Sequence, residues 1–225
     1  IDPATDKIEQ TEGGKTSHIF TYRREQEPLY RNAGFSQVEY LPLAANTDFR
    51  RPVELDESEA EQYRNTLSFV GNSMVGQANR FRERLLELYC VWRGNSEQAI
   101  DEANEAITTI LAAQSDDWCT YRIPELVQEH LSDFSQVMAP QDPEDQPTVL
   151  LAEMAAADKR ITCIANLGQV DIAVWGDEGW SDLEEYGVRH MGPAGHREEL
   201  NRIYSGSTIN LDIGRIYQSG IVTMR

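Results

Sequence analysis

The sequence predicts an α/β fold: a Rossmann-like parallel sheet with a large helical insertion between two of its strands. Short apolar runs alternate with helical patterns on both sides of the chain's centre, and several of these runs end at a glycine. Between them, residues 77–167 are nearly all helical in pattern. Alternation of strands and helices is typical of parallel sheets, because two parallel strands need a crossover connection that is usually a helix.

The first predicted unit is a β-α-β segment near the amino end. Residues 18–22 and 38–41 are short apolar runs suited to strands, and residues 23–33 between them favour a helix that ends at Gly34. A unit of this kind has parallel strands and a right-handed crossover. Residues 44–52 lack periodicity and are interpreted as a linker.

The rest of the chain continues the alternation of strands and helices. Phe81, Leu85, Leu88 and Trp92 recur at helical spacing, which predicts a helix with one apolar face. The predicted elements after the linker are an exposed acidic segment (54–65), a strand (67–71), helices (79–93, 96–113, 116–139 with a break near Pro124, and 148–167), a proline-rich loop (140–147), two strands (171–175 and 187–193), a helix (198–204) and a buried strand (208–213).

The charge of the chain argues against a nucleic-acid partner. It has 20 Lys and Arg residues against 38 Asp and Glu residues, a formal net charge of −18, whereas nucleic-acid affinity comes largely from cations that neutralise phosphates. Cys90, Cys119 and Cys163 are widely spaced and form no C-x-x-C pair, so neither a disulfide framework nor a zinc site is indicated. This cysteine usage favours a cytoplasmic protein, and no apolar run reaches the roughly 20 residues that a transmembrane segment needs.

Two glycine-containing loops that follow predicted strands are candidates for ligand binding. Gly71, Asn72 and Ser73 stand between a strand and a helix, where backbone N–H groups can approach a phosphate. An ordinary tight turn is the favoured alternative, because the spacing matches no phosphate-binding motif. Gly176 and Asp177 follow another strand, where an acidic side chain can bind a ribose or sugar hydroxyl. The alternative there is an acidic turn with a tryptophan at each end packed on the sheet.

The last predicted strand carries two polar residues, Asn210 and Asp212, between apolar ones. In a strand buried on both faces such residues need partners, because unpaired polar groups are costly there. Asn210 can bond a neighbouring loop, and Asp212, closer to the carboxyl end, is the better candidate for ligand binding. Arg215 and Arg225 can then offer charge-assisted hydrogen bonds to a diphosphate. No metal site is predicted around His190 and His196, because a metal needs ligands at convergent positions, usually with carboxylate support.

Four stretches of the sequence resemble one protein family. They are YRNAGFSQVEYLP (30–42) with the residues that follow to Pro52, LSFVGNS (67–73), YSGSTINLDI (204–213) and GIVTMR (220–225). In this order they are similar to segments of the bacterial spore-maturation CgeB-type glycosyltransferase-like family. The resemblance covers roughly residues 18–225, is most specific in the YLPLA and INLDI stretches, and is weakest in the helical region.

The resemblance implies an incomplete two-domain GT-B fold. Residues 1–52 would be the end of an N-terminal Rossmann-like domain with its linker, and residues 53–225 a partial C-terminal donor-binding domain with an insertion at about 77–167. The implied activity is metal-independent and cofactor-free transfer of a sugar from a nucleotide-sugar donor to an unknown acceptor, which is a glycan, a protein or a small molecule. By position, the donor would be bound by Gly71, Asn72, Ser73, Gly176, Asp177, Tyr204, Asn210, Asp212, Arg215 and Arg225. No general base is implied, because acceptor-side residues of such enzymes come largely from the N-terminal domain.

Two other interpretations compete with a glycosyltransferase. A non-catalytic binding or assembly module that keeps the fold but not the chemistry would suit the acidic surface and the large helical region. A receiver- or flavodoxin-type domain would need an acidic cluster or a phosphate loop, and neither is convincing in this sequence. Because no Gly or Pro stop signal follows the last element, we expect the sequence to be a fragment. We also expect it to be less stable than its parent, because half a parallel sheet leaves strand edges uncovered.

Overall fold

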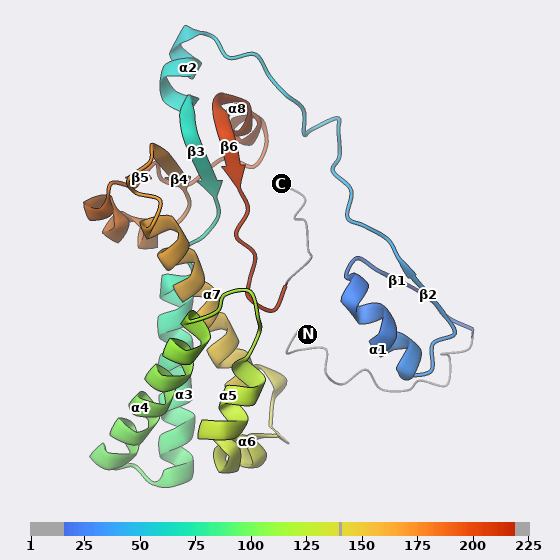
Figure 1. Ribbon diagram of the computed structural model, residues 1–225, viewed down its shortest axis with the longest axis vertical. Helices are drawn as coiled ribbons and strands as arrows, with labels where there is room; N and C mark the ends of the chain where they lie inside the picture. The colour runs from blue at the N-terminus through green and yellow to red at the C-terminus, as the bar shows by residue number, and fades with distance from the viewer. Residues whose placement is uncertain (1–15, 140, 219–225) are drawn as a thin grey trace. The chain divides into compact units, whose positions relative to one another are not determined.

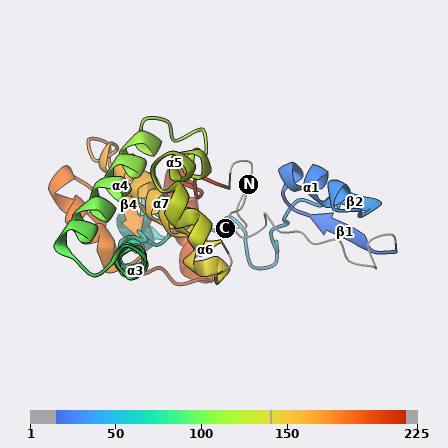
Figure 2. The same cartoon turned by 90° about the horizontal axis from the view of Figure 1, so that it is seen from below.

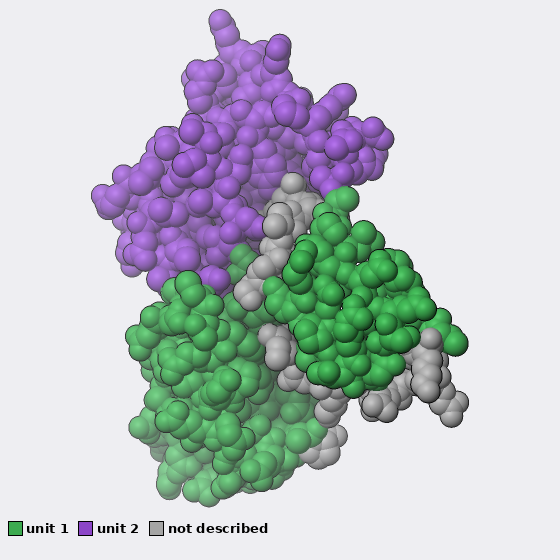
Figure 3. Space-filling view, turned by 45° about the vertical axis from the view of Figure 1, so that its right-hand side comes forward, with its two compact units in different colours: residues 1–44, 83–152, 214–224 green, residues 45–82, 153–213, 225 purple. Residues whose placement is uncertain are grey.

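The computed structural model describes residues 16–139 and 141–218. The chain forms two compact units (Figure 3). Unit 1 comprises residues 1–44, 83–152 and 214–224, and unit 2 comprises residues 45–82, 153–213 and 225. Two helices, α3 (Val75–Arg93) and α7 (Pro147–Ala165), contribute residues to both units. The domain limits implied by the family resemblance stay a prediction.

Unit 2 is built on a four-stranded parallel sheet (Figure 1). Its strands are β3 (Asn65–Val70), β4 (Ile172–Trp175), β5 (Arg189–His190) and β6 (Ser207–Leu211), in the spatial order β5-β4-β3-β6. β4 and β5 lie on one side of β3 and β6 lies on the other, which is the strand arrangement where the two halves of a doubly wound sheet meet. The predicted α/β class with a parallel sheet is therefore confirmed.

Both faces of this sheet are covered, as expected for the fully buried strand β4. One face packs against α7 and a 3-10 segment, η4 (Glu178–Tyr186). Its core consists of Leu67, Phe69, Ile164, Ile172, Val174, Trp180, Leu183 and Val188. The other face packs against α2 (Glu57–Tyr63) and α8 (Glu198–Gly206). Its core consists of Tyr63, Ala173, Trp175 and Ile203.

Strand β6 differs from the buried strand that the sequence predicted. It is the last strand of the sheet within the described part of the chain, and its Ile209 side chain is 50% exposed. Residues 208–210 are all exposed, so Asn210 belongs to a strand at the margin of the sheet. The premise that both of its faces are buried was wrong.

The acidic segment after the linker contains a helix, α2, for which the sequence analysis proposed no element. Its start is a capping box: the Asp56 carboxylate accepts a hydrogen bond from the Glu59 amide (2.9 Å), and the Glu59 carboxylate accepts one from the Asp56 amide (3.2 Å). This reciprocal pair satisfies two backbone donors that a helix start leaves open. Tyr63, in the last turn, then anchors the helix on the sheet.

Unit 1 contains the predicted β-α-β segment. Its strands β1 (His18–Thr21) and β2 (Gln37–Tyr40) pair in parallel, and a 3-10 turn with helix α1 (Glu27–Asn32) connects them. Pro28 lies in the first turn of α1, where a helix tolerates proline because the missing N–H has no intrahelical partner there. The strands, the helix and the parallel pairing are confirmed.

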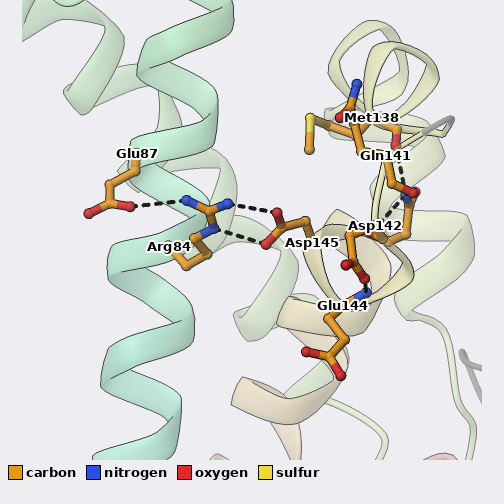
Figure 4. A network of polar contacts seen from close by, with 8 residues as sticks. Arg84, Glu87, Met138, Gln141, Asp142, Glu144 and Asp145 are labelled. Carbon is orange, nitrogen blue, oxygen red and sulfur yellow. Dashed lines mark hydrogen bonds and ion pairs between the residues drawn. The ribbon is translucent and has the colours of Figure 1, made fainter.

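The remainder of unit 1 is mostly helical (Figure 2). Between α3 and α7 the chain forms α4 (Glu97–Ser115), α5 (Ile123–His130), α6 (Ser132–Met138) and the 3-10 turn η3 (Pro143–Asp145). Rings of Tyr89, Trp92 and Phe134 form an aromatic core with centroids 5.2–5.5 Å apart. The Arg84 guanidinium donates hydrogen bonds to both carboxylate oxygens of Asp145, at 2.9 and 2.7 Å, and so connects α3 to η3 (Figure 4).

The segment before Pro124 departs from the predicted helix 116–139. Helix α4 ends at Ser115, and α5 begins at Ile123 with Pro124 in its first turn, so the proline marks a helix start. The fully buried amide of Gln114 holds the intervening loop: its Nε2 donates to the carbonyls of Asp117 and Thr120, both at 2.9 Å.

Candidate functional site

The carboxyl ends of β3 and β6 form the topological switch point of the sheet in unit 2. Phe69 of β3 pairs with Leu211 of β6, so the loops that leave these two strands begin side by side. One loop spans residues 71–74, before α3, and the other begins at Asp212. In open α/β sheets, ligands bind in the crevice outside the carboxyl ends of the strands at such a point. Asn72 and Asp212 are both exposed there.

Side chains from the rest of unit 2 fix the backbone of the loop 71–74. Trp180 donates its indole N–H to the Gly71 carbonyl (2.8 Å), and Arg160 donates to the Asn72 carbonyl (2.8 Å). The Ser73 amide donates to a carboxylate oxygen of Asp177 (2.9 Å). The loop is therefore held in one conformation by contacts with η4, α7 and the segment after β4.

Arg160 connects the two loops of the switch point. This α7 residue is only 8% exposed, and besides the Asn72 carbonyl its guanidinium reaches the Ile213 carbonyl at 3.3 Å. Sequence reasoning missed this residue. The available signal was an arginine within the alanine-rich, apolar pattern of residues 148–167, where a buried charge needs hydrogen-bond partners.

The loop around Gly176 and Asp177 packs directly against the loop 71–74. A Cβ atom on Gly176 would lie 2.2 Å from the Gly71 carbonyl oxygen. The Asp177 carboxylate accepts a hydrogen bond from the Ser73 amide, an N–H group that could otherwise donate to a bound phosphate. Trp175 and Trp180 are buried on opposite faces of the sheet. These contacts are those expected of an acidic turn with packed tryptophans, the structural alternative for this motif.

The predicted residues of α8 and β6 occupy two different places. Asn210 is tied within unit 2, because its side-chain oxygen accepts from the Ser68 hydroxyl (2.6 Å) and its Nδ2 donates to the Tyr204 carbonyl (3.1 Å). Tyr204 lies in the last turns of α8, directly before β6 begins at Ser207, and so belongs to the amino end of that strand. Asp212 follows the carboxyl end of β6, at the switch point.

The two predicted arginines are not part of the switch point as described. Arg215 belongs to unit 1, where its guanidinium donates to the Tyr217 hydroxyl at 2.9 Å. Arg225 lies outside the described residues. Five of the ten predicted residues (Gly71, Asn72, Ser73, Gly176 and Asp177) are thus brought into contact, and Arg160 links this group to the loop that contains Asp212.

The chemistry available in the described residues is limited in two ways. Within residues 16–139 and 141–218, no three or more His, Cys, Asp or Glu side chains are grouped to hold a metal ion. Burial raises the pKa of the Cys163 thiol, which disfavours the thiolate that a nucleophilic cysteine needs. At the opposite end of the strands, hydrogen bonds from the Thr66 amide and then from Arg189 lower the pKa of Asp171, so this carboxylate is ionised and structural.

No protein-family model, curated protein or solved structure matches the chain. The resemblance to the CgeB-type family therefore stays a prediction. In the part of the chain that the structure describes, no helix combines the length and the apolar composition that crossing a membrane requires.

Proposed function

We propose that this chain is the donor-binding part of a GT-B-like glycosyltransferase, which transfers a sugar from a nucleotide-sugar to an unknown acceptor. The observation that supports it most is the strand order β5-β4-β3-β6, which creates a switch point between β3 and β6. Dinucleotide and nucleotide ligands bind at such points in doubly wound sheets. The family resemblance in residues 67–73 and 204–213 covers the sequence around the same two strands.

Donor binding would use the exposed groups at the switch point. Asn72 and Asp212 are the exposed polar residues of the two loops, and their carboxylate and amide groups suit the hydroxyls of a ribose or a sugar. Arg160 acts as a positioning residue, because its guanidinium donates hydrogen bonds to a carbonyl of each loop. Gly71, Ser73, Gly176 and Asp177 would then shape the wall of the site through their contacts with one another.

Transfer would break the bond between the anomeric carbon of the sugar and an oxygen of the diphosphate. The same carbon would form a bond to a nucleophilic atom of the acceptor, which would give up its proton to a base or to water. Negative charge then grows on the leaving diphosphate, and fixed N–H donors or arginines stabilise it best when they are already in place. Of the two arginines that the sequence predicts for this role, Arg215 belongs to unit 1 and Arg225 lies outside the described residues, so their role stays a prediction. No metal ion takes part in the proposed reaction.

The second candidate function is a non-catalytic binding or assembly module with the same fold. The hydrogen bond from the Ser73 amide to Asp177 favours it, because this carboxylate occupies a backbone donor and places negative charge beside the loop. A diphosphate at that N–H would have to displace Asp177 and would be repelled by it. The two functions therefore differ in whether the chain binds a nucleotide diphosphate at all.

A calorimetric and thermal-shift screen against UDP-, GDP-, dTDP- and CMP-sugars separates the two functions. A nucleotide-sugar at one hundred times its Kd should stabilise the chain by about 2.7 kcal/mol. Asn72→Ala and Asp212→Ala should each weaken that binding, whereas Glu178→Gln should not. Glu178 is a matched control because it is an exposed acid at the start of η4, outside the switch point.

Binding of one nucleotide class, lost in Asn72→Ala and Asp212→Ala but kept in Glu178→Gln, would support the transferase. No binding across the panel by a well-folded chain would favour the non-catalytic module. Equal binding by all variants would place the ligand elsewhere and reject the proposed site.

A further inference from the structure

A hollow in unit 2 lies away from the switch point. It is a pocket of about 410 Å³ lined by residues 50–53 and by Asn201, Tyr204 and Ser205. Its α8 residues directly precede the amino end of β6, whereas ligands of the switch point bind at the carboxyl ends of the strands. We propose that this pocket binds the phosphate group of a small-molecule ligand. This inference is independent of the proposed transferase activity.

Hydrogen bonds hold the wall of this pocket against α8 and against the residues just before it. Asn201 donates its amide to the Phe49 carbonyl at 2.7 Å, and the Val53 amide donates to the Ser205 hydroxyl oxygen at 3.0 Å. Between these two contacts, Arg50 donates to the His196 carbonyl at 2.7 Å. A segment without helix or strand is thus held at two points against α8 and at a third against His196, just before the helix begins, which keeps the pocket in shape without a ligand.

The charge of the pocket is opposite to that of the chain. Acidic residues outnumber basic ones by 38 to 20 over the whole sequence, yet the lining residues include two adjacent arginines and no acid. Arg50 is half-buried and anchored, and Arg51 is exposed at the pocket's edge. On a strongly acidic protein, a locally positive pocket attracts anions, whereas the rest of the surface repels them.

The donors of the pocket come from several side chains, so their number suits the three terminal oxygens of a phosphate better than the two oxygens of a carboxylate, and donors of this kind do not suit a cation. Guanidinium groups present several N–H donors in a fork that matches phosphate oxygens. The Ser205 hydroxyl accepts from Val53 and can still donate its own hydrogen, and the Asn201 amide has a second N–H. A volume of about 410 Å³ is also within the range of pockets that hold small molecules. The chemical class is therefore a phosphorylated small molecule.

The test is a titration of the isotope-labelled chain with inorganic phosphate and with pyrophosphate, at constant ionic strength, followed by amide NMR. We expect saturable shifts centred on Val53, Asn201 and Ser205. Arg51→Ala should weaken binding by roughly threefold to tenfold, because it removes one charged donor at an exposed site. Arg51 is exposed, so this variant should keep the fold.

Arg64→Ala is the matched control. Arg64 is an exposed arginine of the same unit, but it borders a hollow with the acids Asp56, Glu57 and Glu61. Its removal lowers the net charge equally and should leave phosphate binding unchanged. Equal weakening by Arg51→Ala and Arg64→Ala would reduce the effect to general charge and overturn the proposal. Absence of saturable shifts at the pocket amides would overturn it as well.

Discussion

Replacing Gly176 by alanine inserts a methyl group between the two loops that follow β3 and β4. The new Cβ would lie 2.2 Å from the Gly71 carbonyl oxygen, 2.6 Å from the Trp180 indole nitrogen and 2.9 Å from its neighbouring ring carbon. The first of these atoms is backbone, and Trp180 is fully buried, so neither neighbour can move aside freely. The loops must separate, and the hydrogen bond from Trp180 to Gly71 is strained or lost.

The expected cost follows from these two effects. Overpacking of this kind costs about 1–3 kcal/mol, and a lost hydrogen bond adds about 1 kcal/mol. Gly176→Ala should therefore destabilise the chain by roughly 2–4 kcal/mol, which corresponds to a fall in Tm of roughly 4–16 °C for a chain of this size. Gly76→Ala is the control, because its Cβ would meet nothing closer than 3.9 Å, in the first turn of α3.

The assay is urea unfolding followed by tryptophan fluorescence, since Trp175 and Trp180 both belong to the core of unit 2. Gly76→Ala should unfold at the same urea concentration as the original chain or a higher one, because alanine favours helix by up to about 1 kcal/mol. A Gly176→Ala chain as stable as the Gly76→Ala chain would refute the close packing of the two loops.

Three further predictions concern single contacts. Arg160→Met should lower the free energy of unfolding by roughly 2–3 kcal/mol, because two loop carbonyls lose a charged donor. Lys159→Met on the same helix should change it by no more than about 0.5 kcal/mol, and equal effects of the two variants in urea unfolding would reject the bridging role of Arg160. Ser96→Ala should cost about 1 kcal/mol by removing the cap of α4, whereas Ser115→Ala, at the other end of α4, should cost less in the same assay. The hydrogen bond from Arg84 lowers the pKa of Asp145. The pair therefore contributes to the free energy of unfolding at neutral pH, by less than about 1 kcal/mol because it is partly exposed. This contribution is lost as the pH falls below about 4. Urea unfolding of the chain and of Asp145→Asn should differ at pH 7, and the difference should shrink as the pH is lowered below the ordinary pKa of an aspartate; a constant difference would contradict this.

Most of the regular elements could be predicted because their signals are local. The four-residue strand β4 is a continuous apolar run, and the apolar face of α3 repeats at helical spacing. Helix α2 shows the limit of this approach, since only a few apolar residues mark it. Its clearest signal was the Asp56 and Glu59 pair three residues apart, the pattern of a capping box.

The candidate site was harder to predict, because its contacts join distant parts of the chain. Ser73 and Asp177 are each found in a loop after a strand, but their pairing depends on the register of β3 against β4 across the whole helical region. Local sequence also cannot tell that Arg160 on α7 reaches both loops of the switch point. The exposure of β6 was missed for the same reason, since the position of a strand in a sheet is set by its neighbours.

In the proposed function, a nucleotide-sugar binds at the switch point between β3 and β6. The most direct measurement is an amide NMR map of the chain with the nucleotide-sugar that stabilises it most. We expect saturable shifts at Asn72, Ser73, Asp212 and Ile213, with smaller changes at the far ends of the strands. Shifts centred elsewhere, or none with any nucleotide-sugar of the four classes, would contradict it.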